Sequence, residues 1–216
     1  ARPGGVGRNI AHDLRLLGVN VSLVTAVGGD VYGQGILDSC RELGIDMSLA
    51  RILPERRSST YLYVTDETGD MQIGIADMEI TECITPEYLA SRMDEINAFD
   101  AVVLDANLSA ESVEYAARHC TAPIIADPVS TAKAMRLVPV LDKLWAIKPN
   151  IYEAEKLTGE HDPEKAAAAL LDKGVKRVFI SLGEEGMLAA ERGSTVHMPR
   201  ELVTVVNTTG AGDAAT

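Results

Sequence analysis

The sequence predicts an α/β fold in which helices flank a mostly parallel, doubly wound sheet. Short β-rich runs alternate with segments that carry apolar residues at helical spacing. Such alternation is typical of a parallel sheet, because each parallel strand needs a crossover connection back to the same edge. A chain of 216 residues, 46% of them hydrophobic, is long enough to bury one main core. We therefore expect one main domain.

The predicted strands are β-branched or apolar runs that end in polar or turn residues. They cover residues 21–29, 100–107, 123–128, 144–150 and 177–183. Helices are predicted between them, the first around Ile10 to Leu17 and the second around Ile36 to Leu43. A further helix, EKAAAALLDKG, is expected to end at Gly174, because glycine readily adopts the left-handed conformation that follows many helices.

One stretch breaks this alternation. Residues 59–78 contain two β-type runs around turn-forming residues, which predicts a β-hairpin. A hairpin inserted in a doubly wound domain projects from it and either covers a site or forms a dimer contact. The alternative is a hairpin packed at a sheet edge.

Charge and composition exclude several classes of partner. The net charge of −12 and the pI near 4.8 argue against a general affinity for nucleic acid or an anionic membrane, which the long-range field repels. No run has the length of a membrane helix, and the N-terminus lacks the apolar core of a signal peptide. The three cysteines are odd in number and widely spaced, so we expect reduced core thiols in a cytoplasmic protein.

The strongest chemical motif is NTTGAGDA, residues 207–214, which follows a strand-like run. A loop of small residues at a helix start leaves backbone N–H groups directed at one point, where the helix dipole favours a phosphate. Asp213 would lie at the edge of that anion site, where a carboxylate suits the base that accepts a hydroxyl proton in phosphoryl transfer. The alternative is an ordinary turn with an aspartate in the first turn of a helix.

A second glycine-rich helix start lies near the N-terminus, in PGGVGRNIAHDLRLLG. Gly4 and Gly5 allow the backbone to approach a ligand, and Asn9 offers a donor and an acceptor to sugar hydroxyls. Ile10 occupies the last glycine position of GxGxxG, so a dinucleotide site is not indicated. The alternative is a glycine turn before an amphipathic helix.

Residues 148–153, KPNIYE, follow a predicted strand at the edge where open α/β sheets bind ligands. Asn150 and Glu153 could hold a hydrated Mg²⁺ near phosphates, since Mg²⁺ prefers oxygen ligands and keeps several waters. The same spacing is close to a capping box, which would satisfy helix N–H groups with no ligand. Asn107, Asp127 and residues 183–186 also fall at the ends of predicted strands, but polar residues and glycines are common in any such loop.

Five segments together resemble, in order and rough spacing, the ribokinase-like (PfkB) family of sugar and nucleoside kinases. They are GGVGRN, GGDVYG, KPNIYE, SLGEEG and NTTGAGDA. The resemblance spans essentially all 216 residues and implies a three-layer α/β/α domain with a small β lid at about residues 59–78. Typical members also have an N-terminal strand and C-terminal helices with no counterpart here, so residues 1–216 resemble one kinase domain truncated at both ends.

The resemblance implies that the protein is an ATP-dependent phosphotransferase, and it assigns roles to the residues of four of these segments and to Asn107. It implies that Asp213 is the catalytic base and that backbone N–H groups form the anion hole at Gly210, Ala211 and Gly212. The implied substrate-binding residues are Gly4, Gly5, Asn9 and Asn107. The implied ATP-binding residues are Asn150, Ser181, Gly183 and Gly186. Asn150 and Glu153 would hold Mg²⁺ through water, and the lid suggests a homodimer.

Within the family, GGVGRNIAHDLRLLG, IADMEI, DPVSTAKA and KPNIYEAEKLTG are most similar to pseudouridine kinases. This implies pseudouridine as substrate, phosphorylated on its ribose 5′-hydroxyl. The alternatives are a kinase for ribose, adenosine or a ketohexose derivative, and a ligand-binding regulator without turnover. Asn207 stands where the family commonly has Asp, which puts activation by a monovalent cation in question.

Overall fold

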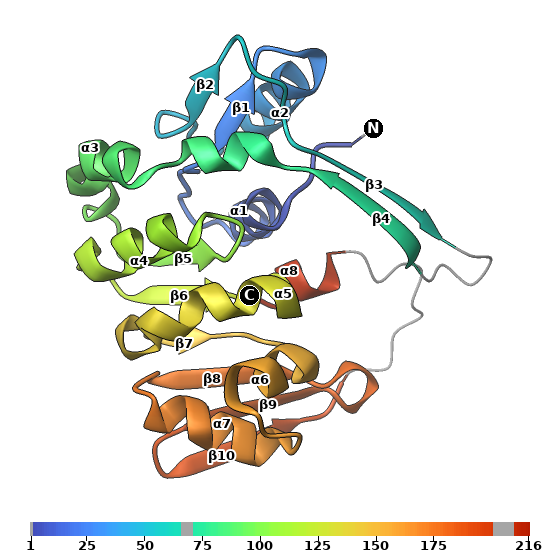
Figure 1. The fold of residues 1–216 in the computed structure, drawn as a ribbon, viewed down its shortest axis with the longest axis vertical. Helices are drawn as coiled ribbons and strands as arrows, with labels where there is room; N and C mark the ends of the chain where they lie inside the picture. Colours follow the sequence, from blue (N-terminus) through green and yellow to red (C-terminus); the bar gives the residue numbers. More distant parts are fainter. Residues whose placement is uncertain (1, 66–70, 201–209) are drawn as a thin grey trace. The chain divides into compact units, whose positions relative to one another are not determined.

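The structure is a computed structural model that describes residues 2–65, 71–200 and 210–216 (Figure 1). The chain divides into two compact units. The first unit comprises Ala1–Thr85 and Val205–Ala214, and the second comprises Pro86–Thr204 and Ala215–Thr216. The first unit is therefore assembled from two segments that are far apart in the sequence.

The first unit contains helices, a parallel strand pair and an antiparallel strand pair. In chain order its elements are α1 (Val6–Leu16), β1 (Ala26–Gly28), α2 (Val31–Glu42), β2 (Arg51–Leu53), β3 (Thr60–Thr65), β4 (Met71–Asp77), the 3-10 helix η1 (Glu79–Cys83) and α8 (Ala211–Ala214). Strands β1 and β2 pair in parallel with Ala26 opposite Arg51, and β3 and β4 pair antiparallel.

Helices α1 and α2 pack through the apolar residues whose spacing predicted them. Ala11 and Cys40 form a buried cluster with Ile45. Arg8 on α1 also donates from Nη2 to the Ser39 hydroxyl on α2 at 2.7 Å. These contacts fix the position of α1 and of Asn9, which lies one residue beyond Arg8.

The GGDVYG segment forms a closely packed corner between β1 and α2. A Cβ atom on Gly28 would lie 2.5 Å from the Arg56 carbonyl oxygen, and one on Gly33 would lie 2.0 Å from the Gly28 carbonyl oxygen. Asp30 caps α2 by accepting from the Gly33 N–H at 2.8 Å, and its other oxygen accepts from the Ser58 N–H at 3.0 Å. In this structure the motif is explained by backbone packing and helix capping.

Strands β3 and β4 occupy the segment for which a hairpin was predicted, and they extend away from α1 in Figure 1. Leu62 is opposite Ile75, and Val64 is opposite Ile73, so four aliphatic side chains share one face. Each of the four is between 60% and 69% exposed. The predicted turn from Asp66 to Asp70 lies outside the described residues, and a role as a lid stays a prediction.

The second unit is built on a six-stranded sheet with the order β10-β9-β8-β7-β6-β5. Its elements are α3 (Pro86–Ile96), β5 (Val102–Asp105), α4 (Ala110–His119), β6 (Ile124–Asp127), α5 (Thr131–Ala134), η2 (Met135–Lys143), β7 (Ala146–Ile147), α6 (Ile151–Thr158), α7 (Pro163–Asp172), β8 (Arg177–Ser181), η3 (Gly183–Glu185), β9 (Met187–Glu191) and β10 (Ser194–Met198). Strands β5 to β8 are parallel, whereas β9 and β10 add antiparallel pairs at one edge.

A single apolar core joins this sheet to the helices that cross it. The core contains fully buried residues from α4, η2, α6, α7 and the strands, among them Val113, Leu137, Leu170 and Ile180. Helix α7 is followed by Gly174 at φ 107°, as predicted from the sequence. The α/β class and the mostly parallel sheet are confirmed. None of the helices in the described ranges is long and apolar enough to cross a membrane.

Three predictions about local structure need correction. The predicted strand at residues 21–29 shortens to β1, with only a bridge from Ser22 to Asp46 before it. The sequence prediction also omitted strands β2, β9 and β10: β2 has only three residues and β10 is exposed along its whole length, whereas β9 has five residues whose burial alternates. All three cysteines are free thiols, but Cys40 alone is buried, whereas Cys83 and Cys120 are half-buried.

Candidate active site

The first unit brings together two motifs from opposite ends of the sequence. The Asn9 amide donates from Nδ2 to Oδ2 of Asp213 at 2.7 Å, although the two residues are 204 positions apart. Asn9 lies on α1 and Asp213 on α8, and both side chains are half-buried. The amide therefore holds one oxygen of the carboxylate that was predicted to be the catalytic base.

The glycine-rich start of α1 is shaped by one backbone conformation. Gly5 precedes the helix at φ 97° and ψ 141°, a region that residues with a side chain rarely adopt. A Cβ atom on Gly4 or Gly5 would meet nothing within 4 Å, so these positions are open on that side. The geometry is consistent with close approach of a ligand, while the α1 helix with its buried face also matches the simpler alternative of a glycine turn before an amphipathic helix.

Helix α8 begins after Gly210, which has φ 83°. The Ala214 N–H donates to the Gly210 carbonyl at 2.9 Å, which closes one turn of helix around Ala211, Gly212 and Asp213. In a helix the first N–H groups have no acceptor in the helix itself, which is the basis of the predicted anion hole. Asn207 and the rest of residues 201–209 lie outside the described residues. The prediction about monovalent-cation activation at Asn207 therefore stays a prediction.

The second unit places the remaining predicted residues at the carboxyl ends of its parallel strands. Asp105 lies opposite Asp127 at the ends of β5 and β6, and Asn150 bridges to Ser181 at the end of β8. Asn107 follows β5, where its N–H donates to Asp105 Oδ1 at 2.8 Å. These residues therefore share one edge of the sheet, where open α/β proteins bind ligands.

A buried charged cluster lies at this edge. Asp127, Lys148 and Glu153 are only 5% to 6% exposed, and Lys148 Nζ lies 3.4 Å from Asp127 Oδ2. Asp127 also accepts from the Thr216 hydroxyl at 2.8 Å. Burial raises the pKa of the Glu153 carboxyl, against the hydrogen bond from the Asn150 N–H that lowers it. Buried charges need partners, and this cluster is held by an ion pair and hydrogen bonds.

Asn150 and Glu153 form the capping box that the sequence analysis kept open as an alternative. The Glu153 N–H donates to Asn150 Oδ1 at 2.9 Å, and the Asn150 N–H donates to Glu153 Oε2 at 2.9 Å. The two residues therefore have a structural role whether or not metal binds. Sequence periodicity could not separate the two roles, because both need an acid three residues after Asn.

The donor set also fits a hydrated magnesium ion. Glu153 and Asp127 supply hard carboxylate oxygens, and Mg²⁺ commonly keeps several waters beside one or two carboxylates. Within residues 2–65, 71–200 and 210–216 there is no group of three or more His, Cys, Asp or Glu side chains placed to hold a metal directly. Magnesium binding through water at Asn150 and Glu153 therefore stays a proposal.

Ser181 and the following glycines form the turn between β8 and β9. The Ser181 N–H donates to the Pro149 carbonyl at 3.0 Å, and the Leu182 N–H donates to the Gly186 carbonyl at 2.8 Å. Gly183 has φ 62° and Gly186 has φ 94°. A Cβ atom on Gly186 would lie 2.1 Å from the Met198 carbonyl oxygen, so this glycine is required by packing alone.

Sequence reasoning missed two cations at the same edge. Lys133 Nζ donates to Asn107 Oδ1 at 2.6 Å, and Arg136 donates to the carbonyl groups after β5. Both residues follow the DPVS turn after β6, and their spacing of three residues on one helical stretch was the signal that could have drawn attention to them.

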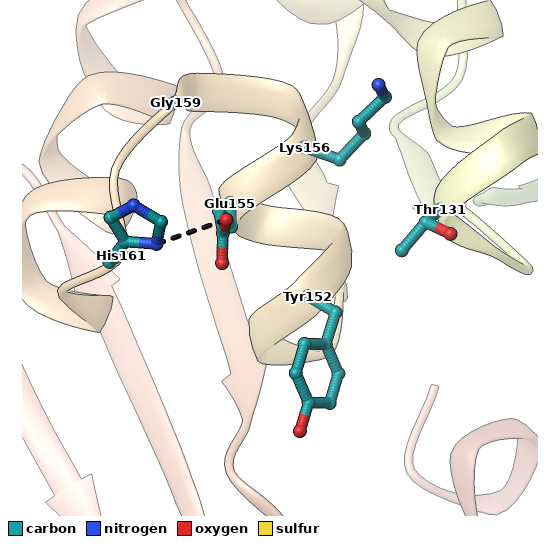
Figure 2. Close-up of a pocket in the computed structure, with 6 residues that line it drawn as sticks. All are labelled: Thr131, Tyr152, Glu155, Lys156, Gly159 and His161. Atoms are coloured by element: carbon teal, nitrogen blue, oxygen red, sulfur yellow. Dashed lines mark ion pairs between the residues drawn. The ribbon is translucent and has the colours of Figure 1, made fainter.

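Figure 2 shows a shallow hollow elsewhere on the second unit. It is lined by Thr131, Tyr152, Glu155, Lys156, Gly159 and His161. His161 Nδ1 lies 3.1 Å from Glu155 Oε1, and the His161 side chain is 84% exposed. None of the residues predicted for chemistry is among those that line it, so it does not mark the predicted site.

A mostly parallel α/β sheet with polar residues at its strand ends is typical of proteins that bind small molecules, and an amide–carboxylate pair at a glycine-rich helix start fits a kinase among them. Comparison with known proteins identifies the family. Residues 1–216 match the pfkB family carbohydrate kinase, and the chain belongs to this family. It is accordingly an ATP-dependent kinase of a sugar or nucleoside.

The chain is similar to several proteins described as kinases. It is 37% identical over 219 residues to the pseudouridine kinase of Escherichia coli strain K12, covering 98% of this chain and 70% of that protein. The solved structure of a ribokinase from Thermotoga maritima is 26% identical, with a TM-score of 0.89, covering 98% of this chain and 70% of that one. An Escherichia coli protein described as a ribokinase II, solved in complex with ATP and Mg²⁺, has a TM-score of 0.87 at 20% identity, covering 99% of this chain and 73% of that one.

Proposed function

We propose that this kinase transfers the γ-phosphoryl group of ATP to the ribose 5′-hydroxyl of pseudouridine, with Asp213 as the general base. The observation that carries the proposal is the 2.7 Å hydrogen bond from Asn9 to Asp213, which joins the two glycine-rich motifs of the first unit. The choice of pseudouridine is supported by the 37% identity to a pseudouridine kinase. At that identity the acceptor is a proposal that needs its own test.

The bond to Asn9 gives the Asp213 carboxylate a fixed orientation. A general base must lie within hydrogen-bond reach of the proton that it accepts, and a rotating carboxylate meets that condition only part of the time. Asn9 is a donor to Asp213 through its amide nitrogen, and its amide oxygen is an acceptor for a sugar hydroxyl. One side chain can thus orient the base and contact the substrate.

The other predicted residues have proposed roles in the same reaction. Gly4, Gly5 and Asn107 would contact the acceptor. The residues proposed for ATP are Asn150, Ser181, Gly183 and Gly186, and the backbone of Gly210, Ala211 and Gly212 would bind the transferred phosphoryl group. Asn150 and Glu153, with the buried charge of Asp127 nearby, would hold Mg²⁺ through water. The ion supplies charge neutralisation of the phosphates when it is bound.

The test is ATP consumption by the complete gene product with Mg²⁺ on a panel of acceptors. The panel is pseudouridine, uridine, adenosine, ribose and fructose 6-phosphate, with Asp213→Asn as the control. Turnover of pseudouridine that is lost in the control supports the proposal. Turnover of a different acceptor rejects pseudouridine but keeps the mechanism, and binding without turnover on any acceptor favours a regulator on the same fold.

A further inference from the structure

The loop that carries Asn107 is held by a cation from the next crossover. Arg136 on η2 donates from Nη1 to the carbonyl oxygens of Ala106, Asn107 and Leu108 at 3.0, 3.1 and 2.7 Å. The guanidinium group is thereby used to fix the backbone. Lys133, one helical turn earlier, is the cation that reaches a side chain.

A strained turn sets the position of Lys133. The Ser130 N–H donates to the Pro128 carbonyl at 2.7 Å across Val129, which has φ 67°, the only positive φ at a non-glycine residue in the described chain. Such a conformation is rare for a β-branched residue and persists where surrounding contacts enforce it. Here the Asp127 carboxylate accepts from the Val129 N–H at 2.7 Å. Helix α5 therefore starts from a fixed point after β6.

The hydrogen bond between Lys133 and Asn107 determines which end of the amide faces outward. An ammonium group is only a donor, so the atom of Asn107 that lies 2.6 Å from Lys133 Nζ must be the oxygen. The amide nitrogen with its two hydrogens then lies on the other side. Among the residues that the structure describes, this nitrogen donates to no protein acceptor.

We infer that Lys133 is a positioning residue that holds the Asn107 amide with its NH₂ group toward the acceptor substrate. Asn107 then recognises an oxygen acceptor on that substrate, either a hydroxyl or a carbonyl oxygen, and discriminates against a donor at the same place. The inference rests on the proposed role of Asn107 as a substrate contact.

The hydrogen bond from Lys133 to Asn107 lies in partly buried surroundings. Burial, together with the nearby Arg136 charge, lowers the pKa of the Lys133 ammonium, whereas the carboxylate of Asp105 raises it. Hydrogen bonds to charged groups in such partly desolvated places are stronger than exposed ones. The amide is therefore held in one orientation before substrate arrives.

The test is a double-mutant cycle in the complete kinase, using whichever acceptor of the panel the wild type turns over. Lys133→Met is expected to raise the KM for the acceptor roughly 3- to 10-fold, with the KM for ATP nearly unchanged. In an Asn107→Ala background the same change is expected to have almost no further effect, because the group that Lys133 orients is gone. Lys143→Met, at an exposed lysine paired with Asp142, is the matched control.

A measurement without turnover separates this inference from the proposed function. The side-chain NH₂ signals of Asn107, assigned with the Asn107→Ala variant, should show a lower ¹⁵N order parameter in Lys133→Met and no change in Lys143→Met. Additive effects in the cycle, a rise in the KM for ATP instead, or an unchanged order parameter would each overturn the positioning role. Failure on pseudouridine with success on another acceptor rejects the substrate and leaves this inference standing.

Discussion

At the scale of single residues, several side chains have two roles that one pattern cannot separate. Asn9 is a residue of a regular helix and also the donor to Asp213. Glu153 is part of a capping box and also a buried carboxylate beside Asp127. Substitutions that keep the structural role while they change the chemistry can distinguish the two.

Asp213→Asn tests the base. The variant keeps the shape of the side chain but cannot accept the proton, so we expect kcat to fall by about 10²- to 10⁴-fold, with ATP affinity and the melting temperature nearly unchanged. Steady-state kinetics and thermal unfolding measure both. Asp94→Asn, at an exposed acid on α3, is the matched control. Near-normal kcat in Asp213→Asn would remove this residue from the mechanism.

Glu153→Gln tests the magnesium proposal. Glutamine can still accept from the Asn150 N–H, so the capping box survives and the free energy of unfolding should change by less than about 1 kcal/mol. The loss of the carboxylate charge should raise the Mg²⁺ concentration needed for half-maximal rate. A titration of rate against Mg²⁺ measures this, with Glu155→Gln, two residues further along α6, as control. An unchanged Mg²⁺ requirement would leave Glu153 with the capping role alone.

At the scale of elements, the corner between β1 and α2 shows how a motif can be structural. Gly28 and Gly33 have no room for a side chain, and Asp30 ties the start of α2 to the Ser58 N–H. These bonds hold the pKa of the Asp30 carboxyl below its ordinary value of 3.8, the hydrogen bond from the Gly33 N–H contributing most. The start of helix α2, against which α1 packs, is therefore held by one half-buried carboxylate.

Asp30→Asn is expected to lower the melting temperature, because an amide can accept from one of the two N–H groups but its nitrogen cannot accept from the other. A carboxyl whose pKa is depressed by folding contributes stability above its unfolded pKa and loses it as the pH falls through the folded value. The loss of melting temperature relative to wild type should therefore be largest near neutral pH, and it should shrink as the pH falls below about 3.8. Thermal unfolding from pH 7 to pH 3 measures it, with Asp172→Asn as control. A constant difference across that range would contradict the capping role.

The elements that the sequence predicted well are those with a clear apolar pattern or with residues that typically end a strand or a helix. Strands β5, β6 and β8 carry apolar runs with polar ends, and α7 ends before a glycine with positive φ. Strand β10 was not predicted; all five of its residues are exposed, so no buried face marks it. The Lys133 to Asn107 bond was equally hidden, since it joins residues 26 positions apart on different crossovers.

At the scale of the whole molecule, the exposed face of the hairpin is a candidate surface for the homodimer predicted from the sequence. Leu62, Val64, Ile73 and Ile75 form a continuous aliphatic face, with Asp77 on the same face at the end of β4. Exposed apolar patches of this kind are typical of interaction sites. The homodimer proposed from the lid would bury this face against the same face of a second copy, as twofold symmetry requires.

The combined variant Leu62→Lys and Ile75→Lys is expected to convert the dimer to a monomer, because like charges would meet across the interface. Sedimentation velocity of wild type and variant measures the mass. Val31→Lys, at an aliphatic residue that is 79% exposed on α2, controls for added charge. Wild type and variant of equal mass would show that the hairpin face does not join two copies.

The discontinuity of the first unit has a consequence for synthesis on the ribosome. Residues 1–85 of that unit emerge first, but Asp213 follows only after residues 86–204 of the second unit have been translated. At usual elongation rates, the 204 positions between Asn9 and Asp213 correspond to about 10 to 40 seconds. A nascent chain thus holds the proposed substrate residues for many seconds without the proposed base. During that time it could bind a nucleoside, but phosphorylation would have to wait until α8 had emerged.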